Sequence, residues 1–281
     1  MILKYNLTTR LKRSYNTLKS LLTISWKYRK DFSLLKKSIR LGERMILSQK
    51  IIWDDGDDFS KITIAFLAKS FQTTRAALLL CRAGLGQDAL TQLRVMFENL
   101  VDFRYMQVDK KRVRDFIDFD ISYKLKMGRI IEQRSKLQVD RDALKLKQSE
   151  LKIEWDKVKS RFMRKNGQGK EIPCGRWSCK DLRTMANEID LVDAYDYFYP
   201  YASGFVHSAA GMANDYVLGR EGDNVVVEVG TSETMVVEAL HTARVFFISM
   251  LDITNDEYKL GFDEKIKELS PKVDTNNGEK I

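Results

Sequence analysis

The sequence has few of the residues that break helices. Its three prolines are Pro173, Pro200 and Pro271, so the first 172 residues contain none. Because proline removes a backbone donor and clashes inside a helix, its absence from so long a stretch predicts a mostly α protein. The chain has 281 residues and is 44% hydrophobic, which is enough to bury a sizeable core. We expect one elaborated domain, or one domain with a long insertion.

Cysteine and long apolar runs are also scarce, and each absence excludes a class of protein. The three cysteines, Cys81, Cys174 and Cys179, are too few and too irregularly spaced for a disulfide framework, and a reducing compartment fits them best. Zinc would need four closely grouped ligands, so we expect no metal, and no other motif calls for a cofactor. No run approaches the roughly 18 apolar residues of a membrane-spanning helix. These features predict a cytoplasmic protein without a membrane anchor.

Charge is unevenly distributed, because the basic excess lies at the start of the chain. Residues 1–50 contain thirteen Lys or Arg and two acids, a balance of +11, whereas the whole chain carries +9 and the remainder therefore −2. Apolar residues recur there at the period of one helix face. Three interpretations are open: an outer helix of a bundle, an arm that binds RNA or DNA, and a membrane-surface or targeting helix. As a nucleic-acid-binding arm it would use Arg10, Lys12, Arg13, Lys19, Lys27, Arg29 and Lys30.

Helical segments follow one another along most of the chain. Gly84 and Gly86 should end one helix and open a tight turn, so that it forms an antiparallel hairpin with the next helix. Residues 129–166 contain neither glycine nor proline, and they would form either one rod of about 57 Å or a hairpin folded near Val139 and Asp140. We divide the chain into basic N-terminal helices (1–56), a core hairpin (57–110), a long charged helical insertion (111–170), the second half of the core bundle (171–256) and a partly disordered C-terminal tail (257–281).

Polar residues on two remote segments indicate a candidate site inside the bundle. Arg94 and Glu98 stand one helical turn apart among apolar neighbours, so the charged pair must lie within the apolar face or at its edge. In the second segment, a helix that begins near Pro200 would place Ser203 and His207 on one face. If that face packs against the first segment, an imidazole, a guanidinium and a carboxylate share a pocket.

Such a pocket would suit cleavage of an RNA phosphodiester by metal-independent acid–base chemistry. Imidazole exchanges a proton near neutral pH, and the 2′-hydroxyl of RNA supplies the nucleophile. Glu98 would orient the ring of His207, and Arg94 would hold a phosphate. The alternative is a satisfied polar network that fixes helix register and does no chemistry. The predicted catalytic residues are His207, Arg94, Glu98, Ser203 and Tyr201.

Several short motifs occur in a fixed order along the chain. They are Ala83-Gly84 to Ala89, Leu93-Arg94 to Glu98, Trp177-Ser178, Met185-Ala186, Tyr197, Tyr201, Ser203 and His207. In combination they resemble the bacterial domain-of-unknown-function family 5677, over roughly residues 63–212, and the family label carries no activity. The spacing of Gly84, Ala89 and Glu98 is also similar to HEPN domains, helical bundles that include metal-independent ribonucleases of toxin and phage-defence systems. Those nucleases carry an Arg near the His of a late helix, and residues 200–206 contain no Arg here.

These observations predict a mostly α helical bundle with a HEPN-like core, a long charged hairpin insertion and a basic N-terminal helix. The function we expect is that of an RNA-directed effector in a bacterial or phage-related defence or toxin system, which binds RNA and could cleave it. The alternative is a non-enzymatic helical protein that binds a partner protein or nucleic acid. We expect RNA rather than DNA as the partner, a homo-oligomer, and no membrane contact.

Overall fold

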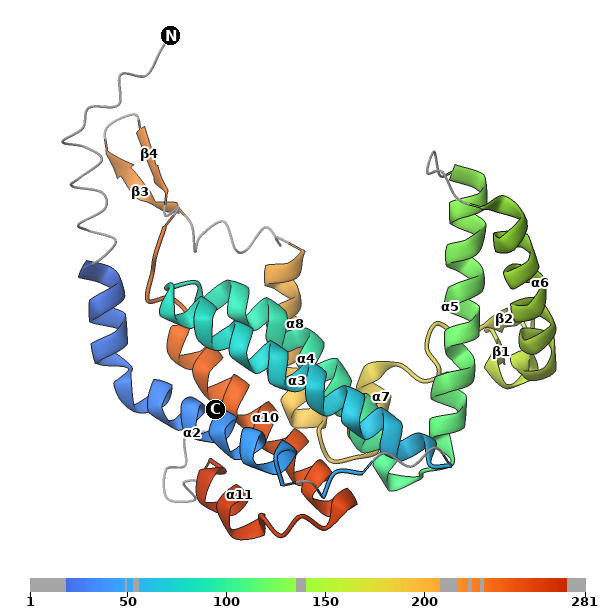
Figure 1. Cartoon of the computed structure of the whole chain (residues 1–281). Coiled ribbons are helices and arrows are strands. Elements are labelled where there is room, and N and C mark those ends of the chain that lie inside the picture. Colours follow the sequence, from blue (N-terminus) through green and yellow to red (C-terminus); the bar gives the residue numbers. More distant parts are fainter. Residues whose placement is uncertain are drawn as a thin grey trace. The chain divides into compact units, whose positions relative to one another are not determined.

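The described part of the protein is mostly helical, with two small two-stranded sheets (Figure 1). The computed structural model describes residues 19–48, 50–52, 56–134, 140–207, 217–221, 224–227 and 230–271. The chain divides into two compact units, and two helices, Asp58–Arg82 and Gly86–Val108, contribute residues to both of them. Unit 1 comprises Met1–Asp54, Thr63–Leu100 and Asp193–Ile281, and unit 2 comprises Asp55–Ile62 and Val101–Val192. The predicted mostly α fold is confirmed, whereas the segment boundaries drawn from the sequence stay predictions.

Unit 1 encloses an aromatic and aliphatic core. Phe97 lies at its centre with no exposed surface, and its ring contacts the rings of Phe198 and Phe246 at centroid distances of 5.9 and 5.3 Å. Helix α10 (Val236–Tyr258) packs on α2 (Arg29–Ile46) and on α11 (Asp263–Leu269). The elements are α2 (Arg29–Ile46), α3 (Asp58–Arg82) from Thr63, α4 (Gly86–Val108) to Leu100, α8 (Val192–Val206), β3 (Val217–Glu221), β4 (Asn224–Val227), α10 (Val236–Tyr258) and α11 (Asp263–Leu269).

The turn between α3 and α4 depends on two glycines. Gly84 has a φ of +69°, a backbone conformation that side chains with a Cβ rarely adopt. A Cβ at Gly86 would lie 2.4 Å from the carbonyl oxygen of Thr234, so only glycine lets the start of α10 approach this closely. Ser232 also donates its backbone hydrogen to the carbonyl of Gly84 at 3.0 Å. The predicted hairpin is therefore confirmed, and the chain before α10 covers its turn.

Unit 2 contains a long helical hairpin and a small cap. Its elements are the ends of α3 and α4 that lie outside unit 1, α5 (Arg112–Arg134), α6 (Arg141–Val158), the 3₁₀ helix η1 (Lys159–Phe162), the strands β1 (Met163–Lys165) and β2 (Glu171–Pro173), and α7 (Leu182–Asn187). A Cβ at Gly128 of α5 would collide with Gln148 of α6, and Asp118 near the start of α5 pairs with Arg161 beyond α6. The two helices therefore run antiparallel.

For the charged insertion, the sequence left two forms open, a single rod and a folded hairpin, and the structure has the hairpin. Asp140 caps α6, because its side chain accepts hydrogen bonds from the backbone of Asp142 and Ala143, each at 3.0 Å. The chain thus folds back instead of forming one rod. Val139, the other residue expected at the fold, lies outside the described residues.

The three cysteines have two different environments. Cys174 and Cys179 form a disulfide across a short loop, whereas the sequence predicted no disulfide framework. Cys81 is buried, and burial raises the pKa of its thiol to about 12, so it stays a neutral thiol. Among the cysteines, only the closely spaced pair therefore has a covalent role.

The ends of the chain are described in part. Helix α11 lies within the predicted C-terminal tail of residues 257–281, and residues 272–281 lie outside the described residues. Along the described ranges, we find no helix whose length and apolar character would let it cross a membrane.

Candidate functional site

A tyrosine hydroxyl joins the predicted arginine and carboxylate where α4 meets α8. Arg94 donates a hydrogen bond from Nη2 to the hydroxyl oxygen of Tyr199 at 2.8 Å. That hydroxyl in turn donates to Oε1 of Glu98 at 2.9 Å, and the two charged groups approach to 3.3 Å. We refer to Arg94, Glu98 and Tyr199 as the seam. The structure thus brings the two predicted charges together through a residue that sequence reasoning did not single out.

Aromatic packing fixes the position of this hydroxyl. The ring of Tyr199 stacks on that of Tyr195 one turn earlier, with centroids 4.9 Å apart, and contacts Phe97 at 6.2 Å. The guanidinium of Arg94 lies 4.9 Å from the Tyr199 ring centroid, within the range of a cation–π interaction. The apolar face of α8 therefore positions the polar group, and the charges lie at the edge of the core as predicted.

Two groups of the seam, Arg94 and Tyr199, each keep one protonation state near neutral pH. The hydrogen bond with Tyr199 is the main cause that raises the pKa of Arg94, so the guanidinium stays charged. Burial is the main cause that raises the pKa of Tyr199, and Glu98 adds to it against the opposing effect of Arg94. The phenol therefore stays neutral and acts as a hydrogen-bond bridge. The Nε of Arg94 is buried without a partner, which leaves one donor of the seam unsatisfied.

The predicted start of α8 at Pro200 is wrong, because the helix begins at Val192 and Pro200 lies inside it. A proline there removes one backbone hydrogen bond. Packing of the preceding aromatic residues on α4 offsets that loss. The longer helix places Tyr199, Ser203 and His207 on one face at four-residue steps. Consecutive hydrogen bonds link them, from Ser203 Oγ to the Tyr199 carbonyl at 2.7 Å and from the His207 backbone to the Ser203 carbonyl at 3.1 Å.

The other predicted catalytic side chains lie outside the seam. His207 is exposed and follows Tyr199 by eight residues, which is about 12 Å along a helix. Within the described ranges, no hydrogen bond joins its imidazole to Arg94 or Glu98. Tyr201 is 47% exposed, and its hydroxyl lies 3.2 Å from the sulfur of Met235. The catalytic role of His207, Ser203 and Tyr201 stays a prediction.

A second polar cluster forms in unit 2 around Asp102, one turn beyond Glu98 on α4. Its carboxylate accepts hydrogen bonds from Arg176 at 2.9 and 3.1 Å and from the indole of Trp177 at 2.9 Å. Both donors lie in the loop that the Cys174–Cys179 disulfide closes. The Trp-Ser motif noted in the sequence therefore anchors this loop.

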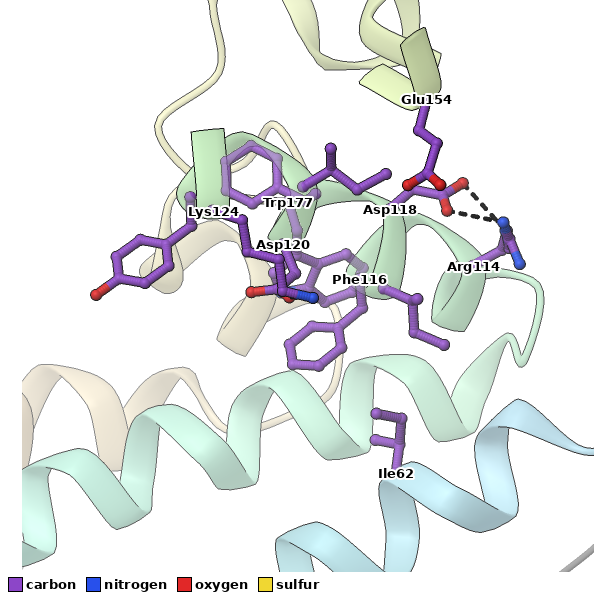
Figure 2. A pocket seen from close by; sticks show the side chains of 12 residues that line it. Ile62, Arg114, Phe116, Asp118, Asp120, Lys124, Glu154 and Trp177 are labelled. Atoms are coloured by element: carbon purple, nitrogen blue, oxygen red, sulfur yellow. Dashed lines mark hydrogen bonds and ion pairs between the residues drawn. The ribbon is translucent and has the colours of Figure 1, made fainter. Parts of the chain in front are cut away.

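A pocket of about 510 Å³ lies beside α5 in unit 2 (Figure 2). Phe116 and Trp177 form an aromatic wall, with an edge-to-face contact at 5.5 Å. Asp118 is 3% exposed and forms ion pairs with Arg114 and Arg161. Sequence reasoning missed this pocket because α5 reads as a mixed charged helix. The one signal was an acidic residue between two apolar ones, Ile117 and Phe119.

Four of the seven predicted nucleic-acid-binding residues lie in the part of the chain that the structure describes. Lys19, Lys27, Arg29 and Lys30 are exposed. Lys27 forms an ion pair with Glu233, so this cation is already partly neutralised. The remaining three predicted cations, Arg10, Lys12 and Arg13, lie outside the described residues.

Comparison with known proteins gives a family and no activity. The family of unknown function DUF5677 matches residues 60–225, which include the central hairpin, the helical insertion and the whole of α8. No curated protein matches the chain, and no solved structure matches it either. The similarity to HEPN domains therefore rests on residue spacing alone. Because the match covers more than half of the sequence, the chain belongs to the family of unknown function DUF5677.

Proposed function

We propose that the protein is an RNA-directed effector of a bacterial or phage-related defence or toxin system, and that it acts in the cytoplasm. RNA binding is supported by the basic surface that residues 19–50 form. Residues 19–50 hold nine Lys or Arg against only Asp31 and Glu43, and most of these cations are exposed. A dense row of exposed cations attracts a polyanion by neutralising its phosphates and releasing counterions.

Cleavage of the bound RNA is the second part of the proposal. Arg94 keeps its charge, and about a fifth of its side chain is exposed, with a relative area of 20%. It can therefore hold a phosphate while Tyr199 and Glu98 fix its orientation. His207 is the exposed residue on this side of α8 whose side chain can act as a general base. In this proposal the imidazole takes the proton of the 2′-hydroxyl and Arg94 stabilises the developing charge.

One observation favours the alternative, a non-enzymatic helical protein that binds a partner protein or nucleic acid. A general base must lie within about 3 Å of the proton that it removes. Within the described ranges, no hydrogen bond joins the His207 imidazole to Arg94 or Glu98, and His207 follows Tyr199 by eight residues, about 12 Å along a helix. Binding without cleavage does not require the imidazole to approach the seam.

A metal-free nuclease assay on a labelled structured RNA separates these functions. The variants are His207→Ala and Arg94→Ala, and His241→Ala is the control because it replaces the other histidine of the chain. We expect wild type and His241→Ala to cut the RNA, and the two site variants to lose at least about 100-fold in rate, as expected for a general acid or base. Equal urea unfolding of all four proteins shows that the loss is chemical.

Two outcomes contradict parts of the proposal. Binding of RNA without cleavage by any form assigns the protein to the non-enzymatic alternative. No binding of RNA by the wild type, tested with several structured and single-stranded RNAs at low salt, removes the RNA part altogether.

A further inference from the structure

A cationic groove of about 250 Å³ lies between α2 and α3 in unit 1. From α2 it is lined by Lys36, Arg40 and Glu43, and from α3 by Arg75, Leu79 and Arg82. Four cations thus surround one carboxylate. We call these six residues the α2–α3 groove.

The sequence places these side chains on matching helix faces. On α2, the residues of the groove follow one another at four- and three-residue steps beside the buried Leu35 and Ile39. On α3, Arg75, Leu79 and Arg82 have the same spacing beside the buried Leu78. Each helix therefore buries one row of apolar residues and leaves a cationic row at the margin of the contact.

The four cations of the groove have no anionic partner within the described part of the chain. Arg75 contacts an aromatic ring instead, because its guanidinium lies 5.8 Å from the ring centroid of Phe71. Some surface lysines elsewhere are paired, as Lys124 is with Asp120 and Lys180 with Glu188. Four cations around a single carboxylate repel one another, and a bound anion reduces that repulsion. The groove therefore favours a negatively charged ligand.

The spacing of the cations selects an extended anion over a single phosphate ion. Arg75 and Arg82 are two helical turns apart, which is about 10.5 Å, and Lys36 and Arg40 are one turn apart, about 6 Å. One phosphate cannot reach all of these groups, whereas a strand with a phosphate on every unit can contact several of them. Guanidinium groups match phosphate oxygens with two parallel hydrogen bonds. Leu79 is 62% exposed at the same place and offers an apolar surface to a ribose or a base.

We infer that the α2–α3 groove binds the phosphodiester backbone of single-stranded RNA. The inference rests on the proposed function and names its contact surface. None of the groove residues is among the cations that the sequence predicted for RNA binding. The binding surface thus extends from the basic N-terminal segment onto the folded core of unit 1.

Charge reversal at the groove, with a control of equal charge change, tests the inference. The groove variant is Arg40→Glu with Arg75→Glu. The control is Lys69→Glu with Lys267→Glu, which reverses two exposed cations of unit 1 outside the groove. Fluorescence anisotropy measures the affinity of each full chain for a labelled single-stranded RNA at about 100 mM salt. We expect the groove variant to bind at least about tenfold more weakly than wild type and the control at most about threefold more weakly.

A second variant tests whether weaker binding comes from the lost charges and not from misfolding. Arg40→Gln with Arg75→Gln removes the charges without introducing acids, and its affinity should fall between those of wild type and the charge-reversed form, with an unchanged melting temperature. Equal losses in the groove variant and the control, or no loss in the groove variant, overturn the inference while RNA binding by the wild type stands. If the wild type itself does not bind RNA, the proposed function fails and the inference fails with it.

Discussion

Tyr199 forms hydrogen bonds with two charged side chains, Arg94 and Glu98, that lie at the edge of the apolar core and are only partly hydrated. A charge at the edge of an apolar face is costly unless it has a partner, and here each charge has two. Arg94 donates to the phenol and approaches Glu98, and Glu98 accepts from the phenol. Because Arg94 stays charged and Tyr199 stays neutral near pH 7, these two groups form a fixed support for a ligand at the exposed edge of the seam.

The first prediction concerns this hydroxyl. Tyr199→Phe leaves the ring packing intact and removes the bridge between Arg94 and Glu98, so we expect the free energy of unfolding to fall by about 1–2 kcal/mol. The matched control is Tyr195→Phe, since Tyr195 stacks on the same ring and its hydroxyl has no hydrogen bond within the described ranges. Urea unfolding measures both. Equal effects of the two substitutions would show that the hydroxyl bridge contributes nothing specific.

Helix α7 in unit 2 shows how a short element is held in place. It has six residues, too few to be stable alone, and Asp181 caps it by accepting a hydrogen bond from the backbone of Thr184 at 2.7 Å. Just after its end, Glu188 accepts hydrogen bonds from Lys180 at 2.6 and 2.8 Å and from the hydroxyl of Tyr105 at 3.0 Å. The cap and this ion pair together fasten the helix to the end of α4.

The second prediction is the pH dependence of this ion pair. The hydrogen bond from Lys180 is the main cause that lowers the pKa of Glu188. A carboxyl with a lower pKa in the folded state stabilises it above its unfolded pKa of about 4.3, and this contribution is lost as the pH falls through the folded value. The groups are more than a third exposed, so the effect stays below about 1 kcal/mol.

The measurement compares wild type with Glu188→Gln by urea unfolding at several pH values. We expect wild type to be more stable by less than about 1 kcal/mol at pH 7, and the difference to disappear as the pH falls below the unfolded value and through the lowered pKa of Glu188. Salt at about 0.5 M should reduce the difference at pH 7 because it screens exposed charges. A difference that is independent of pH would contradict the assigned role of the ion pair.

Local signals in the sequence predicted several elements correctly. Gly84 marked the α3–α4 turn because glycine adopts a positive φ without steric strain, whatever its neighbours are. Asp140 was named as one place where the charged insertion could fold back, and it caps α6. The start of α8 could not be predicted in this way. Proline favours the first turn of a helix, but the packing of Tyr195 and Phe198 on Phe97 extends α8 back to Val192, ahead of Pro200, and no local pattern reveals a contact 100 residues away.

The candidate site was predictable to a similar degree. Helical spacing and apolar neighbours predicted that Arg94 and Glu98 lie at a core edge. The identity of their partner depended on the start of α8, because a helix beginning at Pro200 leaves Tyr199 outside it. The loop that the Cys174–Cys179 disulfide closes is likewise held by Asp102 of α4, a contact between remote segments that no local pattern reveals.

At the scale of the whole molecule, the sequence predicted the charge asymmetry but not its full surface. The excess of +11 charges in the first 50 residues follows directly from the sequence. Arg75 and Arg82 lie outside that segment, and they join it only because α3 packs beside α2. The distinction between paired and unpaired cations also needs the structure, since Lys27 is paired with Glu233 and the groove cations are not. The folded chain therefore offers a larger basic surface than the sequence alone indicates.

A truncation separates the start of the chain from this folded surface. Residues 1–18 contain four Lys or Arg, and removing them stops short of Ile24, which is fully buried. A longer deletion, through residue 28, would remove Ile24 from the core. Each cation that contacts single-stranded RNA contributes about 0.7 to the salt dependence of binding, so this deletion should make the slope shallower by at most about 3.

The most direct test of RNA binding is the salt dependence of the affinity of the full chain for single-stranded RNA, between about 50 and 300 mM salt. We predict that the logarithm of the association constant falls linearly with the logarithm of the salt concentration, with a slope of about −3 or steeper, since at least four cations should contact phosphates. The truncated chain should retain a negative slope, because the α2–α3 groove remains. A slope near zero for the full chain, or no binding at the lowest salt concentration, would contradict the account.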